Sequence, residues 1–147
     1  MTRDRSGQHY HSMYPRPDYG GQRINGTDFT GRDLSGASFM DANADHATFN
    51  RCNLHEVDLS ELTASYCTFV NANLAGADMR WVQLQFCNLQ GADLTGADLT
   101  MSRLTDCDLR GAKFAGAILS GSDIVGCLTD MEQMVYFKLV GGEVRNG

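Results

Sequence analysis

A period of five residues runs through most of this 147-residue chain. Counting in fives from Ile24 to Ile124 reaches an apolar residue every time, and only Ala44 and Ala64 among these central residues are small. Neither an α-helix, with about 3.6 residues per turn, nor a strand, with an alternation of about two, gives this spacing. The period therefore indicates an internal repeat, in which the backbone turns a corner in every unit.

A second inward position lies two residues before each central residue. It holds mostly small residues, and the units run from Gln22 to Gly126 without an insertion. In the one unit where this position is enlarged to Leu62, the central residue is reduced to Ala64, which conserves core volume. We expect stacked coils that share one narrow core, with each unit stable only beside its neighbours.

The units resemble the pentapeptide-repeat family, whose pattern is Ala, then Asp or Asn, then Leu and two variable residues. Residues 92–96, Ala-Asp-Leu-Thr-Gly, match it best. The resemblance implies an all-β fold: a right-handed, four-sided parallel β-helix of about five coils, with four units in each coil. The twenty-residue spacing of four cysteines independently favours four units per coil: Cys67, Cys87, Cys107 and Cys127.

These four cysteines, and Cys52, occupy the small inward position. In a coil of twenty residues the four would stack about 4.8 Å apart, with their side chains pointing the same way. We therefore expect buried free thiols instead of disulfides. A column of thiolates that binds a metal is the alternative, although tetrahedral coordination needs convergent ligands.

Two segments flank the repeats. Residues 1–21 contain glycine, proline and scattered charge, which predicts a flexible N-terminal arm; Tyr19 and other tyrosines could also lay it over the first coil. His9 and His11 are too few ligands for a structural metal site, so we expect no metal and no cofactor.

Residues 127–147 form the expected C-terminal cap. Thr129 and Glu132 fit a capping box, which predicts a short helix over about residues 130–140. A β-helix end needs such a cover against edge-to-edge pairing. Three apolar residues exceed what one core end needs, so they are candidates for a homodimer seam as well as for the cap: Met131, Met134 and Phe137.

The net charge indicates which partners the chain could bind, and its hydropathy indicates where in the cell it could act. Residues 25–124 carry 13 acidic and 6 basic residues, a net charge of −7. This argues against direct nucleic-acid binding and favours a basic protein partner. No apolar run approaches the roughly 20 residues of a membrane helix, and no apolar stretch near the N-terminus fits a signal peptide. We expect a cytoplasmic protein that does not bind membranes.

Sorting the outward residues into columns of twenty predicts one partner-binding surface. Exposed aromatic residues that lie together mark interaction sites, and here an acidic row runs beside them. Two alternatives remain: the aspartates bond nearby backbone amides, and the aromatic rings stack along the solenoid or lie under the N-terminal arm. The candidate residues, expected on one edge, are Tyr66, Trp81, Phe86 and Met101, with Asp58, Asp78 and Asp98.

No catalytic motif stands out, and a solenoid without insertions has no evident cleft. We predict a non-enzymatic protein-binding module with an unidentified partner. The resemblance implies one alternative, because some family members bind DNA gyrase by mimicking duplex DNA and confer quinolone resistance. The acidic repeats and a C-terminal dimer fit this alternative, whereas Arg80, Arg103 and Arg110 interrupt the acidic charge.

Overall fold

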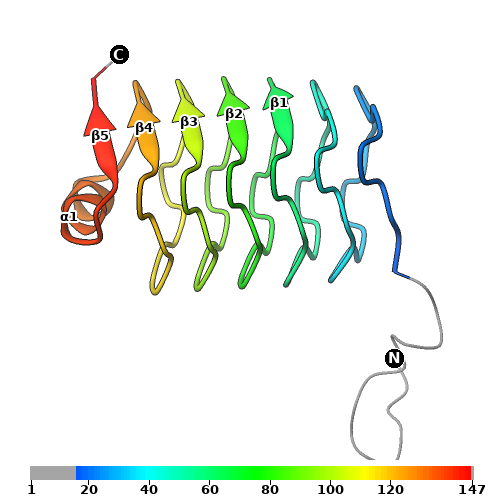
Figure 1. The fold of residues 1–147 in the computed structure, drawn as a ribbon, viewed down its shortest axis with the longest axis horizontal. Coiled ribbons are helices and arrows are strands. Elements are labelled where there is room, and N and C mark those ends of the chain that lie inside the picture. Colours follow the sequence, from blue (N-terminus) through cyan, green and yellow to red (C-terminus); the bar gives the residue numbers. More distant parts are fainter. Residues whose placement is uncertain (1–15, 147) are drawn as a thin grey trace, which may run out of the picture.

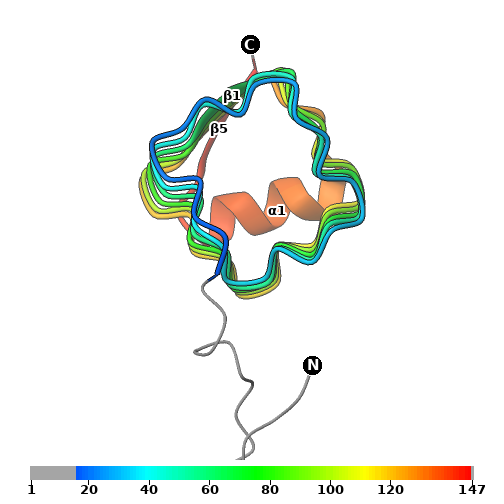
Figure 2. The ribbon, with the colours of Figure 1, turned by 90° about the vertical axis from the view of Figure 1, so that its right-hand side faces the viewer.

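The computed structural model describes residues 16–146. They form the right-handed four-sided β-helix that the resemblance implied, and its coils stack into a rod (Figure 1). Viewed along the rod, successive coils superpose on one four-cornered outline (Figure 2). The bridges join residues that lie 20 positions apart, as in Asp58 to Asp78 and Asp78 to Asp98. The twenty-residue coil predicted from the cysteine spacing is therefore confirmed.

One side of the rod is a regular parallel sheet, the strand side. Its order is β1 (Thr63–Ser65), β2 (Gln83–Gln85), β3 (Arg103–Thr105), β4 (Asp123–Val125) and β5 (Glu143–Arg145). The other three sides pair through isolated bridges. We call the side that carries the Asp58, Asp78 and Asp98 bridges the aspartate side.

The corners explain how five residues complete one unit. All 22 corner residues from 21 to 126 have a positive φ, and 11 of them are glycine. Glycine suits this left-handed conformation, which costs other residues about 1–2 kcal/mol each. The other corner residues therefore include some that are strained, such as Trp81 at φ 61° and Phe86 at φ 54°.

The central residues form the core. Phe29, Phe49 and Phe69 stack on one another, with ring centroids 5.1 and 4.8 Å apart. Both Leu62 and Ala64 are buried, so the paired change in size lies inside the core.

The cysteines are all free. Four are buried, whereas Cys127 is partly exposed. The Sγ atoms of Cys67 and Cys87 are 3.0 Å apart, closer than parallel side chains would place them. Burial raises the pKa of the Cys67 thiol well above its usual value, which keeps it protonated. Within residues 16–146, no three His, Cys, Asp or Glu residues are grouped so that they could hold a metal.

The ladder begins before Gln22, so the N-terminal boundary differs from the one expected. Asp18 pairs with Ser38, and the Tyr19 ring packs on Phe39 with centroids 4.8 Å apart. Tyr19 is thus one more central residue, five before Ile24. The neighbouring glycines and prolines are typical of a flexible segment, so this first unit of the repeat was not recognised from the sequence. His9 and His11 lie outside the described residues.

The C-terminal cap is a helix, α1 (Met131–Leu139), which crosses the end of the core (Figure 2). Its capping box lies one residue later than predicted, at Asp130 and Gln133. Gln133 Oε1 accepts a bond from the Asp130 amide at 2.8 Å, while Gln133 Nε2 donates to the carbonyls of Leu109 and Ala112. A glutamate could not donate in this way, which explains why Glu132 does not take the position.

The three apolar residues predicted in the cap have different surroundings. Phe137 is fully buried, Met134 is half-buried and Met131 is 87% exposed. The exposed face of α1 continues through Val135 and Leu139. Phe137 is therefore part of the core, as a cap residue would be, whereas a homodimer seam needs exposed side chains such as Met131. No helix in the described part of the chain is long and apolar enough to cross a membrane.

Candidate partner-binding surface

The exposed aromatic residues border the strand side on two corners. Trp81 lies two residues before β2, and Phe86 follows directly after it. Because successive corner residues lie on successive corners, these two side chains lie at opposite ends of one strand. The prediction that the aromatics gather on one edge is therefore wrong. They frame a side of the rod.

The tyrosine corner, formed by His46, Tyr66, Phe86 and Asp106, carries stacked rings. The centroids of His46 and Tyr66 are 5.3 Å apart, and those of Tyr66 and Phe86 are 5.1 Å apart, with nearly parallel planes. Tyr66 is nevertheless 55% exposed and Phe86 44% exposed. Stacking along the solenoid and exposure to a partner thus occur together. His46 extends the stack by one coil, although the sequence pattern predicts no binding role for it.

The tryptophan corner, formed by Asp41, Glu61, Trp81, Met101 and Gly121, separates the aspartate side from the strand side. Trp81 is 56% exposed and Met101 is 44% exposed. The Met101 side chain extends over Gly121, where a larger residue would collide with it. This corner therefore combines apolar and acidic side chains in successive coils.

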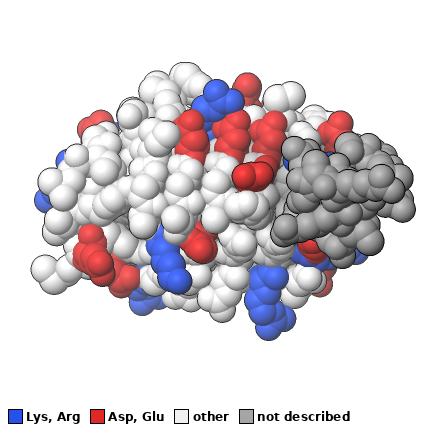
Figure 3. All heavy atoms as spheres, turned by 90° about the horizontal axis from the view of Figure 1, so that it is seen from below, with Lys and Arg blue, Asp and Glu red and all other residues white. Residues whose placement is uncertain are grey.

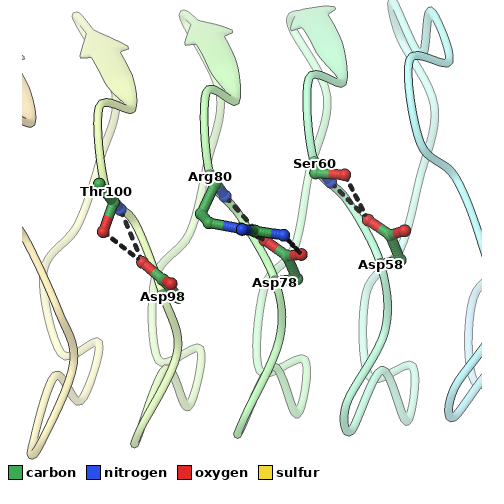
Figure 4. Close-up of polar contacts among 6 residues, drawn as sticks. All are labelled: Asp58, Ser60, Asp78, Arg80, Asp98 and Thr100. Atoms are coloured by element: carbon green, nitrogen blue, oxygen red, sulfur yellow. Dashed lines mark hydrogen bonds and ion pairs between the residues drawn. The ribbon is translucent and has the colours of Figure 1, made fainter.

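The predicted acidic row lies on the aspartate side, but its carboxylates bond within their own coils (Figure 4). Asp58 Oδ1 accepts bonds from the backbone amide and hydroxyl of Ser60 at 2.9 and 2.6 Å. Asp98 holds Thr100 in the same way, with distances of 2.9 and 2.6 Å. These contacts agree with the alternative that the aspartates are local structural residues.

Asp78 differs because its neighbour is a cation. The Arg80 guanidinium donates from Nε and Nη2 to the two carboxylate oxygens at 2.9 and 2.7 Å. This hydrogen-bonded pairing lowers the pKa of Asp78 below its usual value. Figure 3, which shows the rod from below, has basic side chains above and below a short acidic row, so charge of both signs lies on that face. The acidic field is therefore local.

Two shallow hollows lie along the framed strand side. One, of about 380 Å³, is lined by polar side chains of β1, β2 and β3, among them Ser65, Gln85 and Thr105. The other, of about 370 Å³, is lined by Asp41, Glu61, Thr63, Trp81 and Gln83. They share Thr63 and Gln83, so the surface is continuous from the tryptophan corner onto the sheet.

Comparison with known families identifies the repeat. A model of pentapeptide repeats in eight copies matches residues 23–60, 52–91, 65–100 and 87–124. The chain belongs to the pentapeptide-repeat family. No curated protein sequence matches this pentapeptide-repeat protein.

Solved structures show the same fold. Full-length QnrB1, described as a plasmid-mediated fluoroquinolone resistance protein, is 22% identical with a TM-score of 0.55; the match covers 78% of this chain and 73% of QnrB1. Rfr23, a pentapeptide repeat protein from the cyanobacterium Cyanothece 51142, is 21% identical with a TM-score of 0.50, covering 83% of this chain and 92% of Rfr23. At these identities, the likeness extends to the fold alone.

Proposed function

We propose that this pentapeptide-repeat protein is a non-enzymatic protein-binding module, whose partner lies on the strand side. Trp81 and Met101 would contact the partner from one corner, and Tyr66 and Phe86 from the other. The observation that carries the proposal is the presence of three exposed aromatic rings at corner residues with positive φ.

Two costs oppose such residues at these positions. A bulky side chain in the left-handed conformation is strained by about 1–2 kcal/mol relative to glycine. Exposed aromatic surface also favours aggregation and brings no gain from core burial. Glycine occupies half of the corners and would remove both costs. Aromatic rings kept under these conditions support a role in recognition, because Trp and Tyr dominate the energetic centres of protein interfaces.

The acidic residues of the aspartate side indicate that the proposed partner is positively charged. Asp58, Asp78 and Asp98 would attract a basic protein at long range, although their local bonds leave little for direct contact. The five free cysteines fit a reducing compartment, which supports action in the cytoplasm.

Affinity capture tests this proposal. The wild-type protein is compared with a Trp81→Ala/Phe86→Ala variant and with an Arg51→Ala/Asn71→Ala control. The control residues also have positive φ but lie on a corner that does not border the strand side. We expect specific captured proteins to be lost with the first variant and kept with the control. If both variants capture the wild-type set, the aromatic corners have no binding role.

A second candidate is binding of DNA gyrase by DNA mimicry, which the net charge of −7 over residues 25–124 favours. QnrB1, which shares this fold, is a plasmid-mediated fluoroquinolone resistance protein. A gyrase supercoiling assay, with and without ciprofloxacin, decides this candidate. If the protein neither inhibits gyrase nor protects it at tens of micromolar, the mimicry hypothesis is rejected.

We also propose a homodimer through the C-terminal cap. Met131, Val135 and Leu139 recur every four residues and form an exposed apolar stripe on α1. Met134 lies at its margin, while the buried Phe137 supports the helix from below.

A further inference from the structure

The hollow at the tryptophan corner is lined by two acidic residues, Asp41 and Glu61. Among residues 16–146, the carboxylates of Asp41 and Glu61 form no hydrogen bond or ion pair, in contrast to Asp58, Asp78 and Asp98. Both residues are exposed, and both line the same hollow of about 370 Å³. They are available to a ligand that brings positive charge.

The same hollow presents an aromatic face. Trp81 lies in the coil after Glu61 on the same corner, and within the described chain its ring stacks on no aromatic or cationic side chain. A cation placed over an indole gains about 0.5–2 kcal/mol. The hydroxyl of Thr63 and the amide of Gln83 complete the lining with uncharged polar groups.

Within residues 16–146, the two arginines that lie near the hollow do not fill it. Arg80 precedes Trp81, but its guanidinium is held by both oxygens of Asp78 on the aspartate side. Arg103 is directed toward Asp123, with an Nε–Oδ2 distance of 3.7 Å. The hollow therefore keeps a net negative charge, and the Trp81 side chain that lines it stays 56% exposed.

We propose that this hollow binds an arginine side chain of the partner protein. Its guanidinium plane would lie on the Trp81 ring while its N–H groups donate to the carboxylates of Glu61 and Asp41. Arginine fits better than lysine, because a planar, weakly hydrated guanidinium can stack on an aromatic face and donate in its plane. The inference rests on the proposed protein-binding function and specifies the chemistry of the partner's contact residue.

One property of the sequence makes the test specific. Trp81 is the single tryptophan of the chain, so the indole N–H signal in a ¹H–¹⁵N spectrum reports on this hollow alone. The probe is N-acetyl-arginine amide, titrated into the full-length protein. N-acetyl-citrulline amide, with nearly the same shape and no charge, and N-acetyl-lysine amide serve as comparison probes.

We expect a saturable shift of the indole signal with the arginine probe, a much smaller shift with the lysine probe and none with citrulline. An Asp41→Asn/Glu61→Gln variant should weaken arginine binding by about fivefold or more, in line with loss of charge-assisted hydrogen bonds. A Glu56→Gln control, on a different corner with a similar φ of 53°, should bind as the wild type does.

Three results would overturn the inference: no shift with arginine, equal shifts with arginine and citrulline or lysine, or unchanged binding by the double variant. None of them bears on the proposed function, which the capture experiment decides separately. If capture depends on Trp81 but the arginine probe fails, the protein-binding surface stands and the partner contacts Trp81 by other chemistry.

Discussion

The ring of Phe137 meets the ring of Phe114 edge-on, with centroids 4.8 Å apart and planes at 85°. Phe114 is a central residue of the last coils, whereas Phe137 comes from α1. The pair therefore joins the helical cap to the repeats. Gln133 and Tyr136 reinforce the junction by donating hydrogen bonds to backbone carbonyls of the last coils.

We expect Phe137→Ala to lower the free energy of unfolding by about 3 kcal/mol, since it leaves a cavity at a fully buried aromatic residue. Urea denaturation followed by circular dichroism measures this loss. Leu139→Ala, on the same helix but 79% exposed, should change stability by less than about 0.5 kcal/mol. Equal losses would show that α1 is not anchored by Phe137.

Replacing Trp81 with glycine should separate folding from binding. We expect Trp81→Gly to leave the melting temperature unchanged or to raise it slightly, because relief of about 1–2 kcal/mol of left-handed strain offsets the added chain entropy. Partner capture should be lost at the same time. The neighbouring Val82→Gly variant, which empties a buried position, should be destabilised and serves as the calorimetric control. A large destabilisation by Trp81→Gly would mean that the ring supports the fold.

Acid should weaken the rod partly through Asp108. Arg110 donates to both oxygens of this carboxylate, at 3.0 and 2.8 Å, and lowers its pKa in the folded state below the usual 3.8. The stabilisation is thus present above pH 3.8 and is lost as the pH falls through the lower folded-state pKa.

Urea midpoints measured between about pH 6 and about pH 2 test this dependence. Asp108→Asn and Arg110→Gln should each flatten the fall in stability below pH 3.8, because each removes the same interaction. If stability falls as steeply with pH in both variants as in the wild type, the Asp108–Arg110 pair does not cause this pH dependence.

The exposed stripe on α1 predicts self-association. Sedimentation equilibrium should show a dimer for the wild type and a monomer for Met131→Lys/Leu139→Lys, since two desolvated charges are costly in an apolar interface. Met40→Lys replaces another exposed apolar residue, in the N-terminal coils and far from α1, and should leave the dimer intact. A monomeric wild type at high micromolar concentration would exclude the C-terminal dimer.

The cysteines should resist alkylation until the chain unfolds. We expect mass spectrometry without reductant to find five carbamidomethyl groups after denaturation. In the native protein, only the partly exposed Cys127 should react readily. Fewer than five groups after denaturation would reveal a disulfide.

The coil geometry was predictable from the sequence because each unit contacts only its neighbours, so one period determines both core and pairing. The sequence did not predict the position of Trp81 relative to Phe86. Two residues five apart share a unit position but face different directions after one corner, and column sorting alone does not show how far apart the columns lie.

Other errors came from contacts that are distant in sequence. Gln133 caps α1 because it also reaches the carbonyls of Leu109 and Ala112, which no local motif reveals. Likewise, the sequence showed many carboxylates on the repeats, but only their hydrogen bonds distinguish the occupied Asp78 from the free Glu61.

The uninterrupted ladder of twenty-residue coils also sets a length scale. Inserting or deleting one complete coil between Trp81 and α1 would move the tryptophan corner by about 4.8 Å along the axis while keeping every column in register. In a dimer joined at α1, each such step would change the separation of the two tryptophan corners by about twice that amount. The repeat number could therefore act as a ruler, matching the spacing of two contact points on a symmetric partner.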